Sequence, residues 1–390
     1  MKIAYIYTNF HLAGGIERIT SAKLNYLADI EKNDVHLILS DDGSQEPYYK
    51  LSDNIKLHYL SIDFPKNKSL KQFYKWYFKE KQAEKLYEKR LEELLLKEKF
   101  DIVVCVFFNA ASKFLYKIND GSKKILETHQ DKYGALREAE NSKFPLLTHW
   151  SLSNKIKNFD NLTKHYDAFV VLTEGDKSKW KYQNNIHAIP NFTDFVEKHK
   201  SVYADYHQKK VICAGRISHH QHKGWDLLIK AWYIVVKDFP DWHLDLVGTS
   251  NKEPYDLWIQ EVKALNLSKS ISFHPMTNEI EKWYKNHSIF VMASRYEGFG
   301  IVLIEAMSCG LPLVAFDCPS GPAEIITNTE DGYLAEAENI QDLADKLMLL
   351  MKQEEKRREM GYKAKENVMR FSVENVMNQW ESLFKQLLRI

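Results

Sequence analysis

Short segments that are apolar on both faces, alternating with helical stretches, constrain the fold of this chain more than any other feature. Such strands are typical of parallel sheets covered by helices on both sides. The strands expected are Ile3–Tyr7, Val35–Leu39, Ile55–Leu60, Ile102–Phe107, Lys124–Glu127, Ala168–Leu172, Val211–Ala214, Leu244–Val247, Ile271–His274, Ile289–Ala293 and Leu313–Phe316. The alternation predicts an α/β chain of two Rossmann-like, doubly wound domains facing each other across a cleft.

A polar, charged stretch without a clear period, residues 193–210, separates the two halves. The 390 residues are enough for two domains. We expect one Rossmann-like domain over residues 1–195, a second over residues 205–370, and a C-terminal helix over residues 371–390 that packs back on the first domain. Ser372 is placed to cap that helix.

The composition is that of an ordinary globular chain, and a net charge of +1 gives no indication of a nucleic-acid partner. The four cysteines show no CxxC spacing, so they predict a reducing cytoplasm and neither a zinc site nor a disulfide framework. The longest apolar run, 102–108, is too short to span a bilayer. The N-terminus has the pattern of a strand rather than of a signal peptide.

The stretch 294–306 places a turn with two glycines directly before a helix. Gly298 and Gly300 allow the backbone to approach a ligand closely, and the helix directs unpaired N–H groups at the turn, which favours an anion. Glu297 precedes the turn, whereas Glu305 lies on the inward side of the helix, where a carboxylate needs a partner. Taken alone, the stretch predicts an anion site, and a glycine-rich loop with two surface acids is the alternative.

Further short motifs occur in a fixed order around this stretch. They are Gly14-Gly15-Ile16-Glu17-Arg18, Cys213-Ala214-Gly215-Arg216, Lys223-Gly224, Leu246-Val247-Gly248, Cys309-Gly310-Leu311-Pro312 and Pro319-Ser320-Gly321-Pro322-Ala323-Glu324. With them the chain resembles the retaining GT-B glycosyltransferases of glycosyltransferase family 4, whose Glu-x7-Glu motif Glu297 and Glu305 match. The resemblance covers essentially the whole chain and is strongest from 211 to 334. It implies an N-terminal acceptor domain, a C-terminal nucleotide-sugar donor domain, and a metal-independent reaction without a cofactor.

By this resemblance, Arg216 and Lys223 hold the diphosphate of the donor; two solvated surface cations are the alternative. Fixed cations there stabilise the charge that grows on a departing nucleoside diphosphate. Glu305 is expected to accept hydrogen bonds from the ribose, and Glu297 to lie at the donor sugar. The resemblance favours a front-face reaction, with a double displacement through Glu297 as the alternative.

Two features of the first half are expected to complete the site. The Gly14-Gly15 loop would approach the diphosphate across the cleft, a tight turn being the alternative. His129 would orient the sugar or the acceptor, a buried structural histidine being the alternative. No metal ion is expected, because the only suggestive cluster is a loose loop of His219, His220 and His222.

The nucleotide base is expected at two strand ends of the second half, in a small apolar slot that suits uracil. The run 318–326 is similar to that of family members that use UDP-linked hexoses or N-acetylhexosamines, and GDP-mannose remains open. The catalytic residues expected are Glu297, His129, Arg216 and Lys223. The donor-binding residues expected are Gly14, Gly15, Arg216, Lys223, Val247, Gly248, His274, Pro275, Met276, Glu297, Gly298, Phe299, Gly300, Ile301, Val302 and Glu305.

The segment Lys66–Phe78 combines lysines with aromatic residues and contains no acid. This pattern suits an anionic membrane surface, which would help an enzyme whose acceptor is held on a polyprenyl lipid. An ordinary helix with a packed aromatic face is the alternative.

The function expected is transfer of a hexose or N-acetylhexosamine from a nucleotide sugar, UDP-linked, to a glycan or polyprenyl-linked glycan in cell-surface polysaccharide biosynthesis. A GDP-mannose-dependent mannosyltransferase, a non-catalytic sugar-nucleotide binder, and a phosphorylase or epimerase of the same fold are the alternatives. The expected location is the cytoplasm, with the inner face of the membrane as an alternative, and no nucleic acid is expected as a partner.

Overall fold

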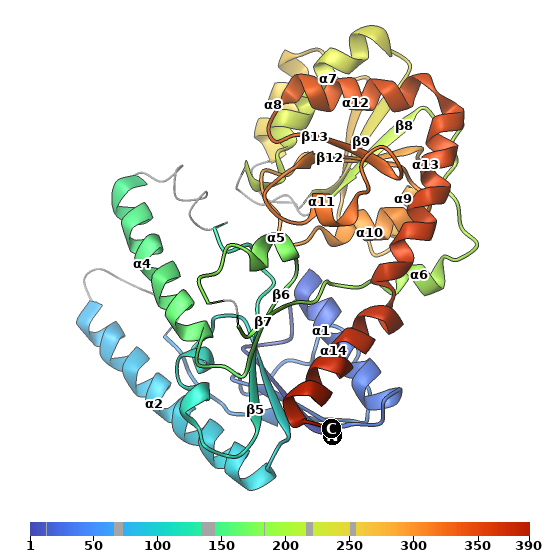
Figure 1. Cartoon of the computed structure of the whole chain (residues 1–390). Helices are drawn as coiled ribbons and strands as arrows, with labels where there is room; N and C mark the ends of the chain where they lie inside the picture. The colour runs from blue at the N-terminus through green and yellow to red at the C-terminus, as the bar shows by residue number, and fades with distance from the viewer. Residues whose placement is uncertain (13, 66–72, 134–144, 183, 216–220, 250–254) are drawn as a thin grey trace.

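The chain folds around two separate parallel sheets, one in each half (Figure 1). The computed structural model describes residues 1–12, 14–65, 73–133, 145–182, 184–215, 221–249 and 255–390. The N-terminal sheet has the strand order β3-β2-β1-β4-β5-β6-β7. Its strands are β1 (Lys2–Tyr7), β2 (Asp34–Leu39), β3 (Ile55–Tyr59), β4 (Ile102–Val106), β5 (Lys123–Glu127), β6 (Ala168–Val171) and β7 (Ile186–Ala188).

The C-terminal sheet has the strand order β10-β9-β8-β11-β12-β13. Its strands are β8 (Lys210–Ala214), β9 (His243–Thr249), β10 (Ile271–Pro275), β11 (Ile289–Met292), β12 (Leu313–Asp317) and β13 (Gly332–Glu336). The predicted fold of two doubly wound α/β domains is therefore confirmed.

Helices cover the sheets. In the N-terminal half they are α1 (Gly15–Asp29), α2 (Phe73–Glu98), α4 (Pro145–Thr163), α5 (Glu174–Lys177) and α6 (Phe195–Lys198), with short 3-10 turns η2 (Ala111–Lys113) and η3 (Leu115–Lys117). In the C-terminal half they are η4 (Gln221–Lys223), α7 (Trp225–Asp238), α8 (Tyr255–Ala264), α9 (Ile280–Lys285), α10 (Ile301–Ser308), α11 (Pro322–Ile325), α12 (Ile340–Lys352), α13 (Glu354–Asn367), η5 (Val368–Phe371) and α14 (Val373–Leu388).

All eleven strands expected from the sequence are present, with ends that differ by at most two residues. The two strands that were not expected, β7 and β13, are the outermost strands on one side of each sheet. Each has a neighbour on one side only, and only two of the five residues of β13 are buried. Edge strands of this kind lack the uninterrupted apolar run that marks a central parallel strand.

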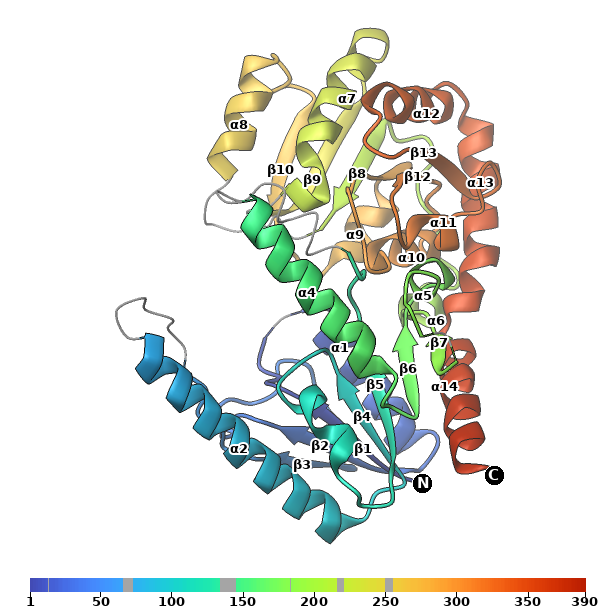
Figure 2. The same ribbon diagram turned by 60° about the vertical axis from the view of Figure 1, so that its left-hand side comes forward.

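The final helix, α14, returns to the N-terminal half of the molecule, as the red ribbon shows (Figure 2). Ser372 accepts a hydrogen bond from the backbone N–H of Asn375 at 3.2 Å, so the predicted cap is confirmed. Val376, Met377 and Trp380 belong to the same buried cluster as the residues of β1 and α1. Helix α14 thus covers one face of the N-terminal sheet.

The connecting stretch 193–210 carries buried side chains of its own. It contains α6, and Phe195 and Val196 pack into the hydrophobic cluster that surrounds α10. All four cysteines are buried, and none of them forms a disulfide. Within the described part of the chain, no helix has the length and apolar character needed to cross a membrane.

Candidate active site

The turn before α10 is the centre of the candidate site. Strand β11 ends at Met292, and the chain then passes through Glu297 and Gly298 before α10 begins at Ile301 with Gly300 as its N-cap. Carboxyl ends of parallel strands open onto the same edge of a sheet, so this turn lies where ligands bind in doubly wound folds.

Glu297 is buried and forms an ion pair with the predicted phosphate-binding lysine. Lys223 Nζ donates to its Oε1 at 2.7 Å, and Ser294 Oγ donates to the same oxygen at 2.7 Å. Burial raises the pKa of Glu297, but Lys223, His222 and the two hydrogen bonds outweigh burial and leave the pKa below its ordinary value. The side chain is therefore a carboxylate at neutral pH. Ser294 was not expected here, although it lies only three residues before Glu297.

The glycine that follows Lys223 allows the backbone at this point to lie close against the end of β11. Gly224 has φ +60°, and a Cβ there would lie 1.8 Å from the carbonyl oxygen of Ala293, so only glycine fits. The ring of His222 stacks on Tyr296 at 4.3 Å, and its Nε2 lies 2.6 Å from the Tyr296 carbonyl oxygen.

Some of the residues expected here lie outside the described part of the chain: Arg216, His219 and His220. Arg295, which sequence reasoning passed over, anchors the turn from the other side. Its guanidinium donates to both oxygens of Asp226 at 2.8 and 2.6 Å and to Glu338 at 2.9 Å. A bidentate pair of this kind fixes orientation as well as distance.

Glu305 is buried one and a half turns into α10 and pairs with a residue of the other domain. Arg18 of α1 donates to its Oε1, and the hydroxyl of Tyr284 donates to its Oε2 at 3.4 Å. Burial lowers the pKa of Arg18, but the Glu305 carboxylate outweighs burial and raises it. The partner that a buried Glu305 requires is thus Arg18, which the sequence suggested only as part of a helix start.

The Gly14-Gly15 loop meets the same helix. A Cβ on Gly15 would lie 3.7 Å from Cδ1 of Ile301, the first residue of α10. Gly14 caps α1 and lies against the carboxylate of Glu17, which accepts a hydrogen bond from Tyr7 at 3.1 Å. The N-termini of α1 and α10, one from each domain, therefore lie next to each other.

His129 lies in the loop after β5, directly against the turn. A Cβ on Gly298 would lie 2.3 Å from the His129 carbonyl oxygen, so the approach of the two domains requires glycine at position 298. The ring of His129 is buried, with Nε2 2.9 Å from Oε1 of Glu127. It is the backbone of His129, rather than its ring, that contacts the turn.

A second set of contacts joins the domains beside the turn. Lys179 Nζ donates to Ser320 Oγ at 2.6 Å and to the Pro319 carbonyl at 2.9 Å, and Ser320 Oγ donates to Asp131 at 2.9 Å. The N–H of Gly175 donates to Glu324 at 2.6 Å. These contacts, which we call the clasp, fix the run 318–326 against the N-terminal domain. The sequence offered no signal for them, because each partner is distant in the chain.

The predicted base slot lies at the ends of β9 and β10. Thr249 Oγ1 donates to the His274 carbonyl at 2.9 Å, and the N–H of Met276 donates to the Thr249 carbonyl at 3.2 Å. Nε2 of His274 forms a hydrogen bond of 2.6 Å with Oδ1 of Asp245. The ring centroids of His274 and Trp283 lie 4.3 Å apart. Val247 is buried, whereas Met276 is exposed.

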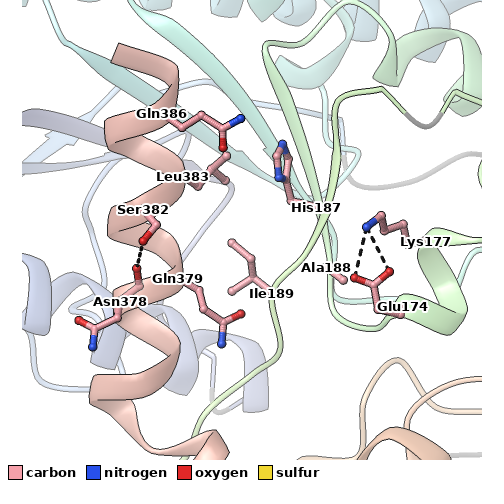
Figure 3. A pocket seen from close by; sticks show the side chains of 10 residues that line it. All are labelled: Glu174, Lys177, His187, Ala188, Ile189, Asn378, Gln379, Ser382, Leu383 and Gln386. Atoms are coloured by element: carbon pink, nitrogen blue, oxygen red, sulfur yellow. Dashed lines mark hydrogen bonds and ion pairs between the residues drawn. The ribbon is translucent and has the colours of Figure 1, made fainter. Parts of the chain in front are cut away.

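Cavities also lie outside this turn. A cavity of about 700 Å³ opens at the carboxyl ends of β1, β2 and β3, lined by Thr8, Asn9, His11, Ser40, Asp41, Asp42, Ser44, Gln45, Ser61, Ile62, Asp63, Phe64 and Pro65. Another, of about 450 Å³, lies between α14 and the segment after β7 (Figure 3). None of the predicted site residues lines the second cavity, so it is separate from the candidate site.

Comparison with known proteins supports this geometry. Residues 194–367 match the family model described as Glycosyl transferases group 1. The chain is 28% identical to an uncharacterized glycosyltransferase of Haemophilus influenzae, over 98% of this chain and 99% of that protein. It is also 28% identical to the poly(ribitol-phosphate) alpha-N-acetylglucosaminyltransferase of Staphylococcus aureus, over 75% of this chain and 57% of that protein.

The fold is similar to that of S. aureus TarM, solved as a mutant in complex with fondaparinux, alpha-GlcNAc-glycerol and UDP. The TM-score is 0.73 at 18% identity, over 98% of this chain and 100% of that chain. At this identity the likeness concerns the fold alone.

Proposed function

We propose that this chain is a retaining, metal-independent glycosyltransferase, because residues 194–367 match the family model described as Glycosyl transferases group 1. Its donor is a UDP-linked hexose or N-acetylhexosamine, and its acceptor is a glycan, free or held on a polyprenyl lipid, in cell-surface polysaccharide biosynthesis. The observation that carries the proposal is the Glu297–Lys223 pair, at 2.7 Å, on a turn that the N-terminal domain touches through His129.

Each polar group around the turn has a use in sugar transfer. The N-terminus of α10 and the ammonium of Lys223 attract the diphosphate, and both stabilise the charge of the leaving group. Arg216 is the proposed second cation. When Lys223 turns to phosphate, the Glu297 carboxylate becomes available to accept hydrogen bonds from the sugar hydroxyls.

The environment of Glu297 favours the front-face route. Its Oε1 accepts a hydrogen bond from Ser294 as well as from Lys223, and the Ser294 bond remains when Lys223 turns to the diphosphate, so this oxygen stays a hydrogen-bond acceptor. A nucleophile for double displacement gains from being free of such partners, because hydrogen bonds lower the nucleophilicity of the oxygen that accepts them.

The acceptor is proposed to bind in the cavity of about 700 Å³ at the ends of β1, β2 and β3. Hydroxyl, amide and carboxylate groups from Thr8, Asn9, Ser40 and Asp63 can each bond a sugar hydroxyl. The aromatic ring of Phe64 offers an apolar face beside them. The name of the N-acetylglucosaminyltransferase relative supports an N-acetylhexosamine as the transferred sugar.

A panel of UDP- and GDP-sugars, assayed for donor hydrolysis and transfer, tests the proposal. We expect turnover with a UDP-sugar and a loss of about 100-fold or more in kcat/KM for Lys223→Met, since one fixed donor at a developing charge is worth that much. Lys230→Met, on the exposed face of α7, is the matched control and keeps full activity.

Two results would contradict the proposal. Tight binding of UDP without turnover on a broad acceptor panel points instead to a non-catalytic binder. Turnover with GDP-mannose alone identifies a mannosyltransferase and rejects the UDP assignment.

A further inference from the structure

Three ionisable side chains form a buried row beneath the candidate site. Lys23 Nζ of α1 donates to Oε1 of Glu127 at 2.5 Å, and Nε2 of His129 lies 2.9 Å from the same oxygen. The side chains of Lys23 and Glu127 are each 2% exposed, and that of His129 is 1% exposed. We call these three residues the buried row. Among the described residues, Oε2 of Glu127 and both ring nitrogens of His129 have no hydrogen-bond partner, so the Nε2–Oε1 contact is a close approach rather than a hydrogen bond.

The charges of the buried row depend on one another. Burial raises the pKa of Glu127, but Lys23 and His129 outweigh burial and lower the pKa to about 2. Burial likewise lowers the pKa of Lys23, against the opposing effect of Glu127. The ammonium of Lys23 also lies 3.8 Å from the ring centroid of Trp380 in α14, a cation–π contact. Removing one member would leave its partner charged and buried, which is strongly unfavourable.

The location of the buried row links separate parts of the site. Lys23 lies on α1, the helix whose N-terminus begins at the Gly14-Gly15 loop. Glu127 is the last residue of β5, and His129 presents its carbonyl oxygen to Gly298. One carboxylate therefore connects the two segments of the N-terminal domain that contact the turn of the C-terminal domain.

We propose that Glu127 is a positioning residue for sugar transfer, which holds the His129 loop and α1 in the register that the Gly298 turn requires. The inference rests on the proposed function and adds a residue that contacts neither donor nor acceptor. Lys23 is its counter-charge, and Trp380 keeps that counter-charge in place. A small displacement of either segment changes how the two domains meet at the donor.

The test compares two double variants of the full chain. Lys23→Met with Glu127→Gln removes both charges of the buried row, which avoids leaving a single buried ion. Lys124→Met with Asp120→Asn removes a second buried ion pair, at the opposite end of the same strand β5, and is the matched control. Each protein is assayed with the UDP-sugar panel for kcat and KM, and by hydrogen–deuterium exchange over residues 15–22 and 127–131.

For the buried-row variant we expect kcat to fall about 10- to 100-fold, as a misplacement of about 1 Å can cost this much, while KM for the donor changes less than about threefold. Exchange rises in both segments. The control loses stability but keeps kcat and the exchange of those segments. Lys23→Arg, which retains the ion pair, recovers most of kcat.

An unchanged kcat, or an equal loss in the control, overturns the positioning role of Glu127 while the proposed function stands. If the unaltered chain turns over none of the sugars, the proposed function fails, and the exchange measurement still tests whether Glu127 holds the two segments. Equal protection of both segments in the variant and the unaltered chain then rejects the positioning role of Glu127.

Discussion

The two glutamates of the motif, eight residues apart, have partners of different origin. Glu297 is paired within its own domain, with Lys223, whereas Glu305 is paired across the domains, with Arg18. Both side chains are buried, and each has a cation beside it, which a buried carboxylate requires. Sequence reasoning identified the need of Glu305 for a partner, but it had no means of finding Arg18, since the two lie 287 residues apart.

The buried row also makes a prediction about acid stability. The pKa of Glu127 is depressed from the ordinary 4.5 to about 2, so its contribution to folding is fully present above pH 4.5 and is lost as the pH falls from 4.5 towards 2. The difference in unfolding free energy between the unaltered chain and Glu127→Gln should therefore shrink over this window.

Urea unfolding between about pH 5 and about pH 3.5 measures that difference. Asp53→Asn is a suitable control, because Asp53 is exposed in the turn before β3. If the difference in unfolding free energy stays constant over this pH range, the carboxylate of Glu127 is not stabilised by Lys23 and His129 in the folded protein.

At the scale of elements, the central strands and the turn before α10 were predictable from the sequence, whereas the edge strands β7 and β13 were not. Strands such as β4, with five buried apolar residues, carry their own signal. The strands β7 and β13 do not, and α13 has a strongly charged sequence with few buried residues. The clasp and the buried row were also beyond prediction, because they depend on how distant elements pack rather than on local pattern.

The glycine turn gives a prediction at this scale. In Gly298→Ala, the added Cβ would lie 2.3 Å from the His129 carbonyl, so the two domains must separate locally. We expect kcat to fall by about 10-fold or more, since the approach of the domains aligns the reacting groups. Gly121→Ala is the control: its Cβ meets open space at φ +86°, so it costs stability through backbone strain alone.

Steady-state kinetics of both variants, together with thermal unfolding, separate the loss of domain alignment from the loss of stability. A Gly298→Ala enzyme with full kcat would falsify the importance of the contact with His129.

The start of α2 carries the membrane prediction. Residues 66–72 of the Lys66–Phe78 segment lie outside the described chain, while Tyr77 and Phe78 on α2 are exposed. We expect the protein to sediment with anionic vesicles at low salt and to be released at high salt, as for an electrostatic contact. Lys75→Glu with Lys79→Glu should abolish sedimentation, whereas Lys85→Glu with Lys89→Glu, farther along α2, should not. Absence of binding at low salt rejects the membrane surface as a partner.

At the scale of the whole molecule, polar contacts join the two domains in the part of the chain that the structure describes. Lys179 supplies two of them, to Ser320 and the Pro319 carbonyl, and Ser320 donates a third to Asp131. Polar contacts of this kind form and break with ligand binding more readily than a large apolar interface, so the domains are suited to opening and closing around a donor.

Removing the clasp should therefore shift the molecule towards an open form. For Lys179→Ala, small-angle X-ray scattering without ligand is expected to give a larger radius of gyration, and UDP should reduce it. Lys177→Ala is the matched control, because Lys177 pairs with Glu174 of its own helix. Identical scattering curves for the two variants would show that the clasp does not control the separation of the domains.

The pair between Arg18 and Glu305 has one more consequence, for affinity. Arg18 occupies the carboxylate that the ribose is proposed to use, so the Arg18–Glu305 pair competes with donor binding. If Glu305 is released from Arg18 in only about 1% of molecules, the apparent affinity for the donor is about 100-fold weaker than the intrinsic affinity. An arginine far from the reacting bond would in this way set the donor concentration at which the protein begins to respond.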